Sequence, residues 1–352
     1  ADIAPYMDKD FFQNIPMTQT ERITMASRPK QPKYARNKNI LVIGGSGSGK
    51  TRFFVKPNAL QCSGSYFFLD PKGELTYCLG GAMERNGVTV TVIDFVHFRG
   101  HYNPVAYLKT DEDAMKLAYA LVFNTKKNPA ASGGENEFWD KSAVMFLASL
   151  ILYILYESPL YERNLNTMMD MILECKVSED SYDENRMDIL FGELEQRDPH
   201  HPAVLQYRSF KLGSAKTLSS IMVTAVSNLH MLQSAAFAEM IATDEMFLPK
   251  LGVEKCAIFC VIPDNDDTFN FMVSILYTQL FDQLFRLADS TPEFHGTLPV
   301  HVRLMMDEFA NVATPENFVK ILAVARSRNI SCDIILQNIS PVSYTHLTLP
   351  TT

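Results

Sequence analysis

Apolar and polar positions follow two different patterns along this chain. Short apolar runs bounded by turn residues predict buried strands, whereas apolar residues recurring every three to four positions predict helices. From residue 39 to 108 these patterns alternate, and such alternation is typical of a parallel sheet covered by helices. The predicted strands are NILVIGG, GSYFFLD and VTVTVIDF, and the predicted helices between them are KTRFFVKPNALQC and LTYCLGGAMERNG.

The pattern changes between residues 109 and 235, where nearly every segment has helical spacing and none resembles a strand. The predicted helices are DEDAMKLAYALVF, NEFWDKSAVMFLASLILYILYE, NLNTMMDMILEC, ENRMDILFGELEQ and SAKTLSSIMVTAVSNLHML. Alternation then resumes, with strands at 255–263, 300–308 and 332–337 and helices at 266–288 and near 315–327. We therefore predict an α/β domain, discontinuous over 39–108 and 236–341, with an all-α domain inserted at 109–235.

Both ends of the chain differ from this plan. Residues 1–38 are polar and include five basic residues between positions 28 and 38, which suits a solvated linker or a segment near a membrane surface or DNA. The tail VSYTHLTLPTT at 342–352 matches nothing before it and reads as a non-native sequence scar.

Composition excludes few classes of protein. The formal net charge of −8 argues against a generally basic surface, although a local basic ring remains compatible with it. Six cysteines without a CxxC pair predict buried free thiols in a reducing compartment. The longest apolar run, residues 143–156, is shorter than the roughly 17–25 residues of a spanning helix and predicts a core helix.

A phosphate-binding loop follows the first predicted strand. The run Gly44, Gly45, Ser46, Gly47, Ser48, Gly49, Lys50 and Thr51 fits GxxxxGK[ST], and the strand before it and the helix after it supply the required context. Glycines let backbone N–H groups surround phosphates, Lys50 is expected at the β- and γ-phosphates, and Thr51 at Mg²⁺. We also assign Arg52 to this site. The predicted cofactors are ATP and Mg²⁺.

A second acidic motif ends the strand at 300–308. Asp307 is predicted to hold Mg²⁺, directly or through a water molecule, and Glu308 to polarise a water for attack on the γ-phosphate. Together with the loop, this pair favours a hydrolase over a kinase or a slow switch.

Three further polar features have open interpretations. Gln337 ends the last predicted strand, where its side chain would face the crevice at the carboxyl edge of the sheet. Arg326 and Arg328 precede that strand, either as solvated residues or as an arginine finger for a neighbouring subunit. The segment Asp70-Pro71-Lys72-Gly73-Glu74 is good turn chemistry, and its role stays open.

Taken together, these motifs resemble those of the type IV secretion coupling proteins, the TraG/VirD-type ATPases of bacterial conjugation. The matching segments are VIGGSGSGKTRFFVKPN, LDPKGEL, YNP, FWDKSA, MMDEFANV, ARSRN and ILQNIS, in the family's order over about residues 38–340. The resemblance implies a RecA-like P-loop NTPase fold, a homo-hexamer and attachment to the cytoplasmic face of the bacterial membrane by N-terminal helices. It also implies delivery of relaxase-bound single-stranded DNA, or of effector proteins, to a secretion channel.

Residue roles carry over from the resemblance by position. Lys50 and Thr51 match the family's nucleotide loop, Asp307 and Glu308 its second motif, and Gln337 its sensor glutamine. Arg326 falls where an arginine completes the adjacent subunit's site, and Arg328 is the weaker choice. The resemblance also implies that a membrane anchor precedes Ala1 and that further core strands follow Ser340, so we expect this chain alone to bind ATP weakly and hydrolyse it poorly.

Two other functions remain open at this point. One is a substrate-receptor platform that uses ATP mainly to assemble its ring, because pore-facing residues cannot be identified. The other is a double-stranded DNA translocase of the FtsK/HerA kind, which the DPKGE and DEFAN phrases and the helical insert disfavour.

Overall fold

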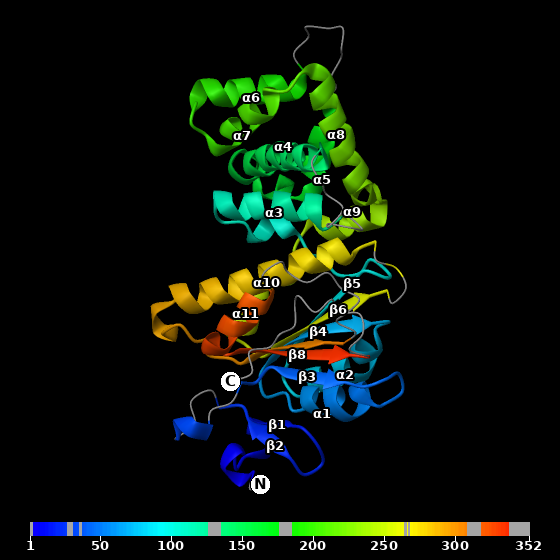
Figure 1. Cartoon of the computed structure of the whole chain (residues 1–352), viewed down its shortest axis with the longest axis vertical. Helices are drawn as coiled ribbons and strands as arrows, with labels where there is room; N and C mark the ends of the chain where they lie inside the picture. Colours follow the sequence, from blue (N-terminus) through cyan, green and yellow to red (C-terminus); the bar gives the residue numbers. More distant parts are fainter. Residues whose placement is uncertain are drawn as a thin grey trace. The chain divides into compact units, whose positions relative to one another are not determined.

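The computed structural model of the chain describes residues 3–26, 31–34, 37–125, 135–175, 185–263, 266, 268–307 and 318–337. Contacts divide the chain into two compact units (Figure 1). The first, here called the sheet unit, contains Ala1–Gly100, Met246–Phe269 and Leu276–Thr352. The second, the helical unit, contains His101–Glu245 and Asn270–Ile275. The units thus divide near residues 100 and 245, against 108 and 235 in the prediction from sequence.

The sheet unit is built around a parallel sheet of six strands in the order β3-β8-β7-β4-β6-β5. The strands are β3 (Ile40–Ile43), β4 (Ser65–Pro71), β5 (Thr89–Asp94), β6 (Cys256–Ile262), β7 (Val302–Met306) and β8 (Ile330–Leu336). The four inner strands are almost wholly buried, which explains their continuous apolar runs, whereas the edge strand β3 alternates between half-buried and exposed residues.

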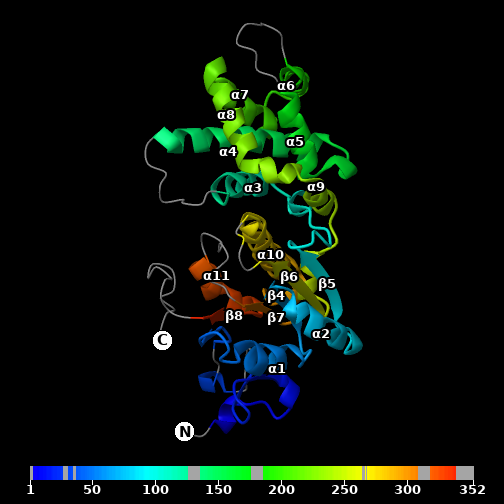
Figure 2. The ribbon, with the colours of Figure 1, turned by 90° about the vertical axis from the view of Figure 1, so that its right-hand side faces the viewer.

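Helices cover both faces of this sheet. One face packs against α1 (Lys56–Ala59) and α2 (Glu74–Arg85), through a core that includes Phe54, Leu79 and Phe68. The other face carries α10 (Asn270–Ser290) and α11 (Phe318–Ala325), as Figure 2 shows. On this face the ring centre of Phe67 lies 5.2 Å from that of Tyr277 on α10. A six-stranded parallel sheet with helices on both faces, interrupted in sequence by a helical unit, confirms the predicted fold class.

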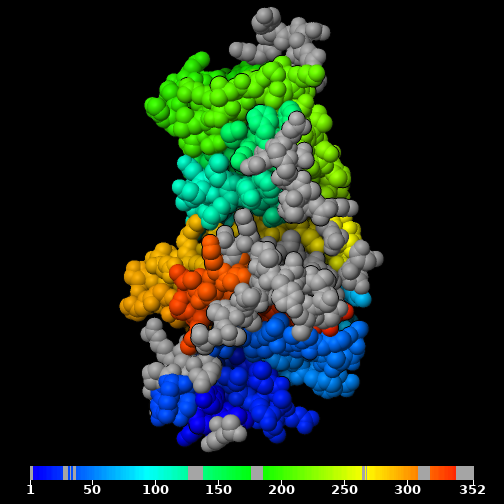
Figure 3. Space-filling model, in the orientation of Figure 1, coloured from blue at the N-terminus to red at the C-terminus, as the bar shows by residue number. Residues whose placement is uncertain are grey.

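The N-terminal segment, predicted as irregular, contains a short antiparallel hairpin of β1 (Asn14–Pro16) and β2 (Arg22–Thr24). The side-chain amide of the buried Asn14 donates hydrogen bonds to the carbonyls of Asp8, Asp10 and Phe11 and so orders the preceding turn. The hairpin lies against α1, and the space-filling view shows it at the surface beside that helix (Figure 3). Strands of three residues are too short for an apolar period to reveal them.

The helical unit contains, among its described residues, helices and no strand. Its α-helices are α3 (Asp111–Phe123), α4 (Glu135–Glu157), α5 (Leu165–Glu174), α6 (Arg186–Arg197), α7 (Pro202–Lys211), α8 (Ala215–Leu229) and α9 (Ala235–Ala242). Polar N-cap side chains at Thr110, Asn164, Asn185 and Ser214 fix where four of them begin. The sequence prediction missed α7, which starts at a proline and is only ten residues long, and also missed α9, which begins where the predicted helical domain ends.

Helix α4 forms the centre of this unit's core and packs against α3, α5, α7 and α8. Within the described residues, its span Phe138–Glu157 is long and apolar enough to cross a membrane, and 67% of its most apolar window is buried inside the protein. The pair Ala215–Gln233 and Ala235–Ala242 meets the same criteria only if taken as one span, and it is bent by 87°. Five of the six cysteines are buried and Cys78 is exposed; all six are free thiols.

Candidate nucleotide site

The predicted phosphate loop leaves the carboxyl end of β3. Gly47 and Gly49 have φ angles of +75° and +85°, which L-residues rarely adopt, and a Cβ atom on Gly49 would lie 2.4 Å from the ring of Phe53. The ammonium group of Lys50 turns back over the loop and donates hydrogen bonds to the carbonyls of Gly44 (2.6 Å) and Gly45 (3.1 Å). The loop therefore has backbone angles that call for glycine, and the Lys50 side chain folds back against the loop carbonyls.

The helix after the loop begins as a π-helix over Thr51–Val55 and continues as α1. Pro57 gives a physical reason, because a proline has no N–H to donate and its ring crowds the carbonyl four residues earlier, that of Phe53. The side chain of Asn58 donates to the carbonyl of Phe54 (2.8 Å) and so supplies a hydrogen bond where the regular backbone pattern of the helix is interrupted. Arg52 is exposed on this segment, with its guanidinium 5.6 Å from the ring centre of Phe53.

The structure brings together the two residues predicted to hold Mg²⁺. Thr51 lies at the start of the helix and Asp307 directly after β7, yet the Thr51 hydroxyl donates to Oδ2 of Asp307 over 2.9 Å. Both offer oxygen atoms, the ligands that Mg²⁺ prefers, and Mg²⁺ commonly takes only one or two protein ligands beside phosphate oxygens. Among the described residues, no group of three or more His, Cys, Asp or Glu side chains is placed to hold a metal ion.

Strand register places two further residues at the same edge. β8 lies between β3 and β7, and the N–H of Gly44 donates to the carbonyl of Leu336, so Gln337 follows β8 directly beside the phosphate loop. Pairing of Leu69 with Met306 likewise places Asp70 next to Asp307. Glu308, the predicted catalytic carboxylate, lies outside the described residues.

Asp70 has a structural task in its own chain. Its carboxylate accepts hydrogen bonds from the backbone N–H groups of Leu75 (2.9 Å) and Thr76 (2.7 Å) and from the Thr76 hydroxyl (2.6 Å). It thereby satisfies the free N–H groups at the start of α2, after a turn in which Lys72 and Gly73 both have positive φ. Burial raises the pKa of Asp70 above its ordinary value, although these hydrogen bonds act in the opposite direction. The conspicuous DPKGE phrase thus positions a helix next to the candidate site.

Replacing Asp70 by alanine should lower the free energy of unfolding by about 1–2 kcal/mol, because three hydrogen bonds at the start of α2 lose their acceptor. The measurement is urea unfolding followed by circular dichroism. Glu74→Gln is the matched control, since it removes only the exposed ion pair with Lys56 and should cost less than about 0.5 kcal/mol. Equal effects of the two substitutions would contradict the capping role.

The two arginines before β8 differ in their surroundings. Arg328 forms an ion pair with Asp289 on α10 (2.7 Å), and its guanidinium lies 4.8 Å from the ring centre of Phe285. Arg326 is exposed and lines a cavity of about 980 Å³ with Lys255, His301 and other residues. Its guanidinium makes no hydrogen bond or ion pair with any described residue. Arg328 is therefore engaged within its own chain, whereas Arg326 is open to an approaching molecule.

Reasoning from sequence overlooked a charged residue inside an apolar strand. Arg303 lies within the run VHVRLMMDE, which was interpreted only through its acidic end, and its side chain is 2% exposed. It pairs with Asp333 on β8, also treated only as part of an apolar strand. The sequence did contain a signal for this pair, because each residue is charged and lies within a run of apolar residues predicted to be a buried strand.

Comparison with known proteins decides the family. The family described as "Type IV secretory system Conjugative DNA transfer" matches residues 7–346. The chain belongs to this family. A search of curated proteins finds no match.

Solved structures show the same fold. The bacterial conjugative coupling protein TrwBdeltaN70, crystallised with sulphate, matches with a TM-score of 0.54 and 15% identity, over 88% of this chain and 66% of that one. The plasmid coupling protein TrwB with the ATP analogue ADPNP matches with a TM-score of 0.53 and 16% identity, over 87% and 65% of the two chains. TrwB with ADP and Mg²⁺ matches with a TM-score of 0.51 and 14% identity, over 87% and 65%. The chain thus spans about two thirds of the length of the coupling proteins that it resembles.

Proposed function

We propose that this member of the conjugative DNA transfer family binds ATP with Mg²⁺ and hydrolyses it to drive a substrate into a type IV secretion channel. The observation that supports the proposal best is the 2.9 Å hydrogen bond between Thr51 and Asp307, which joins two predicted magnesium ligands from distant parts of the sequence. The phosphate loop and Gln337 lie at the same edge of the sheet. The structures of TrwB with ADPNP and with ADP and Mg²⁺ agree with a nucleotide site in this fold.

Each residue has one task in this proposal. The phosphate loop binds the triphosphate, and Lys50 exchanges its carbonyl partners for β- and γ-phosphate oxygens. Thr51 and Asp307 hold Mg²⁺, which neutralises the phosphate charge, and Glu308 accepts the proton of the attacking water. Gln337 senses the γ-phosphate, and Arg326 completes the site of a neighbouring subunit.

The partners follow from the family and are part of the proposal. They are single-stranded DNA carrying its relaxase, the components of the secretion channel, and the bacterial cytoplasmic membrane. The assembly is a homo-hexamer. An ATP-assembled receptor platform without pumping is the second candidate, because the helical unit offers a surface for cargo that needs no ATP turnover.

Two substitutions test the site. Lys50→Ala should weaken binding of a fluorescent ATP analogue roughly 100-fold with or without Mg²⁺, because charge-assisted hydrogen bonds to phosphate are lost. Asp307→Asn should remove roughly a tenfold gain in affinity that Mg²⁺ provides and leave the affinity in EDTA nearly unchanged. The control is Lys56→Ala, which alters a half-buried lysine on the same helix that pairs with Glu74. Equal losses for Asp307→Asn in both conditions would exclude its role at the metal.

A further inference from the structure

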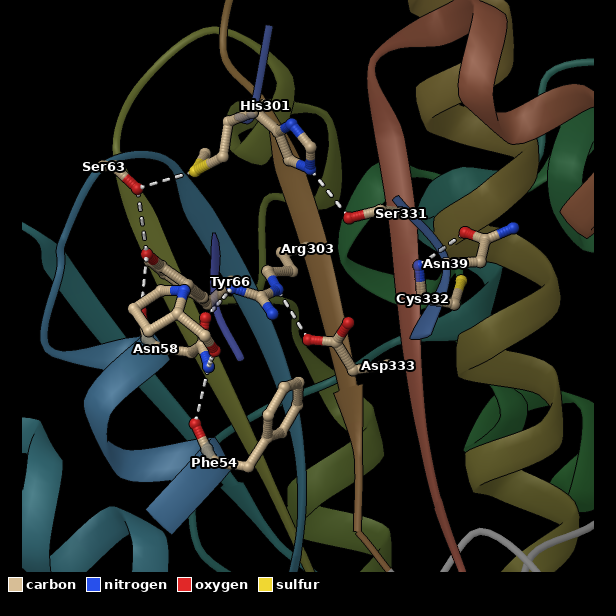
Figure 4. Close-up of polar contacts among 12 residues, drawn as sticks. Asn39, Phe54, Asn58, Ser63, Tyr66, His301, Arg303, Ser331, Cys332 and Asp333 are labelled. Atoms are coloured by element: carbon tan, nitrogen blue, oxygen red, sulfur yellow. Dashed lines mark hydrogen bonds and ion pairs between the residues drawn. The ribbon is translucent and has the colours of Figure 1, made fainter. Parts of the chain in front are cut away.

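A buried polar cluster lies beneath the candidate site, between the sheet and the helix that follows the phosphate loop. Nε of Arg303 donates to Oδ2 of Asp333 (2.5 Å), and its Nη1 donates to Oδ1 of Asn58 (2.7 Å). These three residues come from β7, β8 and α1, as Figure 4 shows. The ring of Phe54 lies 5.8 Å from the guanidinium carbon.

Stability alone gives no good reason for this cluster. Asp333 and Asn58 are fully buried and Arg303 is 2% exposed, so two full charges have been removed from water. Nη2 of Arg303 and Oδ1 of Asp333 have no hydrogen-bond partner among the residues that the structure describes, so the desolvation is only partly compensated. Burial raises the pKa of Asp333, while the Arg303 charge acts to lower it. Buried pairs of this kind are often no more stabilising than apolar residues of similar size.

The strand period connects the cluster to the site. Side chains two and four residues apart share a face of a strand, so Arg303 lies on the face of Asp307, and Asp333 on the face of Gln337. Met305 and Ile335 lie between them and belong to the apolar core beneath α1. Asn58 follows Thr51 by about two helical turns. The cluster is therefore the polar layer on which an apolar layer, and then the site, are stacked.

Its hydrogen bonds also fix the helix. The side-chain amide of Asn58 donates to the carbonyls of Phe54 (2.8 Å) and Pro16 (2.9 Å), so its orientation is determined and its oxygen faces Arg303. The guanidinium of Arg303 is planar and its N–H groups point in fixed directions, so it can bind Asp333 and Asn58 at once, which a flexible lysine could not do. Rotation or sliding of α1 against β7 would break the bond to Asn58 and move Thr51 away from Asp307.

We propose that Arg303, Asp333 and Asn58 are positioning residues of the nucleotide site. They fix β7, β8 and the helix after the phosphate loop in the arrangement in which Thr51 meets Asp307. This inference rests on the proposed function of that site. It adds that the affinity gained from Mg²⁺ depends on three buried residues that touch neither nucleotide nor metal.

The decisive variant carries Arg303→Met and Asp333→Val together, which removes both charges and leaves no unpaired one. It should unfold in urea at or above the parent's midpoint, as expected when apolar residues replace a buried pair. Its affinity for a fluorescent ATP analogue in EDTA should stay within about twofold of the parent's. The roughly tenfold gain with Mg²⁺ should fall to less than about threefold, because Thr51 and Asp307 are no longer held together.

Two further variants complete the test in the full chain. Arg303→Lys keeps the charge but reaches only one partner, so it should lose part of the gain with Mg²⁺ and guards against failure of the double variant to fold. Ser331→Ala is the control, because it breaks the buried hydrogen bond from β8 to His301 (2.8 Å) without touching α1. Its gain with Mg²⁺ should equal the parent's.

The outcomes separate the two proposals. A folded double variant that keeps the parent's full gain with Mg²⁺ overturns the positioning role and leaves the proposed function intact. A parent that binds no ATP analogue overturns the proposed function, and the positioning role fails with it. If the Ser331→Ala control also lost the increase in affinity that Mg²⁺ provides, the effect would reflect a general loss of order in the sheet. That result would also overturn the inference.

Discussion

Replacing Glu308 by glutamine should reduce ATP turnover by about 1,000-fold while ATP affinity stays the same or rises. A positioned general base contributes roughly 10²–10⁴-fold to such a reaction, and glutamine keeps the shape of the side chain but accepts no proton. Turnover is measured as phosphate release by the assembled protein in the presence of single-stranded DNA. Glu293→Gln is the control, because Glu293 is an exposed carboxylate in the turn after α10.

The same variant separates the two candidate functions when conjugation is scored in cells. A pump driven by hydrolysis predicts that Glu308→Gln abolishes DNA transfer and, because it still enters hexamers, also inhibits transfer when expressed beside the parent protein. A platform that needs ATP only for assembly predicts normal transfer. Transfer at the parent's frequency, with turnover shown to be lost, would therefore rule out pumping.

Some parts of this molecule were readable from sequence because their signals are local. Inner strands buried on both faces give continuous apolar runs, and all six strands of the sheet were located. The phosphate loop is a contiguous motif, and two of its glycines, Gly47 and Gly49, adopt positive φ angles that explain why glycine stands there. Asp307 was found because parallel strands end at one edge, so a carboxylate there faces a loop from another strand.

Other parts depend on partners that are distant in sequence. The hairpin at the N-terminus has strands of only three residues, and α7 starts at a proline, so neither gave a period to recognise. Pairing of Arg303 with Asp333 depends on the register between β7 and β8, which places Arg303 opposite Ser331 and thus near Asp333. A single sequence shows a charge in an apolar run but not the residue that neutralises it.

The position of Arg326 excludes a role in its own nucleotide site. It lies in the turn before β8, at the amino edge of the sheet, whereas the phosphate loop lies at the carboxyl edge, beside the end of the same strand. β8 has seven residues, and at about 3.3 Å per residue this separates the two edges by roughly 20 Å. An arginine side chain cannot span that distance. If Arg326 acts at a nucleotide site, as we propose, that site must belong to another subunit.

Burial and the nearby charges of Arg326 and Arg303 lower the pKa of Lys38 to about 8. Arg326 therefore contributes to a concentration of positive charge at the amino edge of the sheet. Lys38 itself is buried and contacts His301, so it is part of the protein interior, whereas Arg326 is exposed. Of these positive charges, only that of Arg326 is exposed, as a residue must be to reach the triphosphate bound by a neighbouring subunit.

Replacing Arg326 by alanine should therefore reduce turnover of the proposed hexamer by about 1,000-fold, the lower end of what an arginine finger contributes. The ATP affinity of the dispersed subunit should stay unchanged, because its own site lacks this residue. Arg328→Ala is the control: it breaks the ion pair with Asp289 and should affect stability more than turnover. Turnover of Arg326→Ala near the parent's level would contradict the role.

Mixing two inactive variants tests directly whether the site is shared. Arg326→Ala subunits keep an intact phosphate loop, and Lys50→Ala subunits keep an intact arginine. In a mixed ring, an Arg326→Ala subunit whose site receives the arginine of a Lys50→Ala neighbour is complete, and equal mixing makes about a quarter of all sites of this kind. Turnover should rise far above that of either variant alone. If Arg326 served its own subunit, no mixed ring would contain a complete site, and the mixture would stay as inactive as its components.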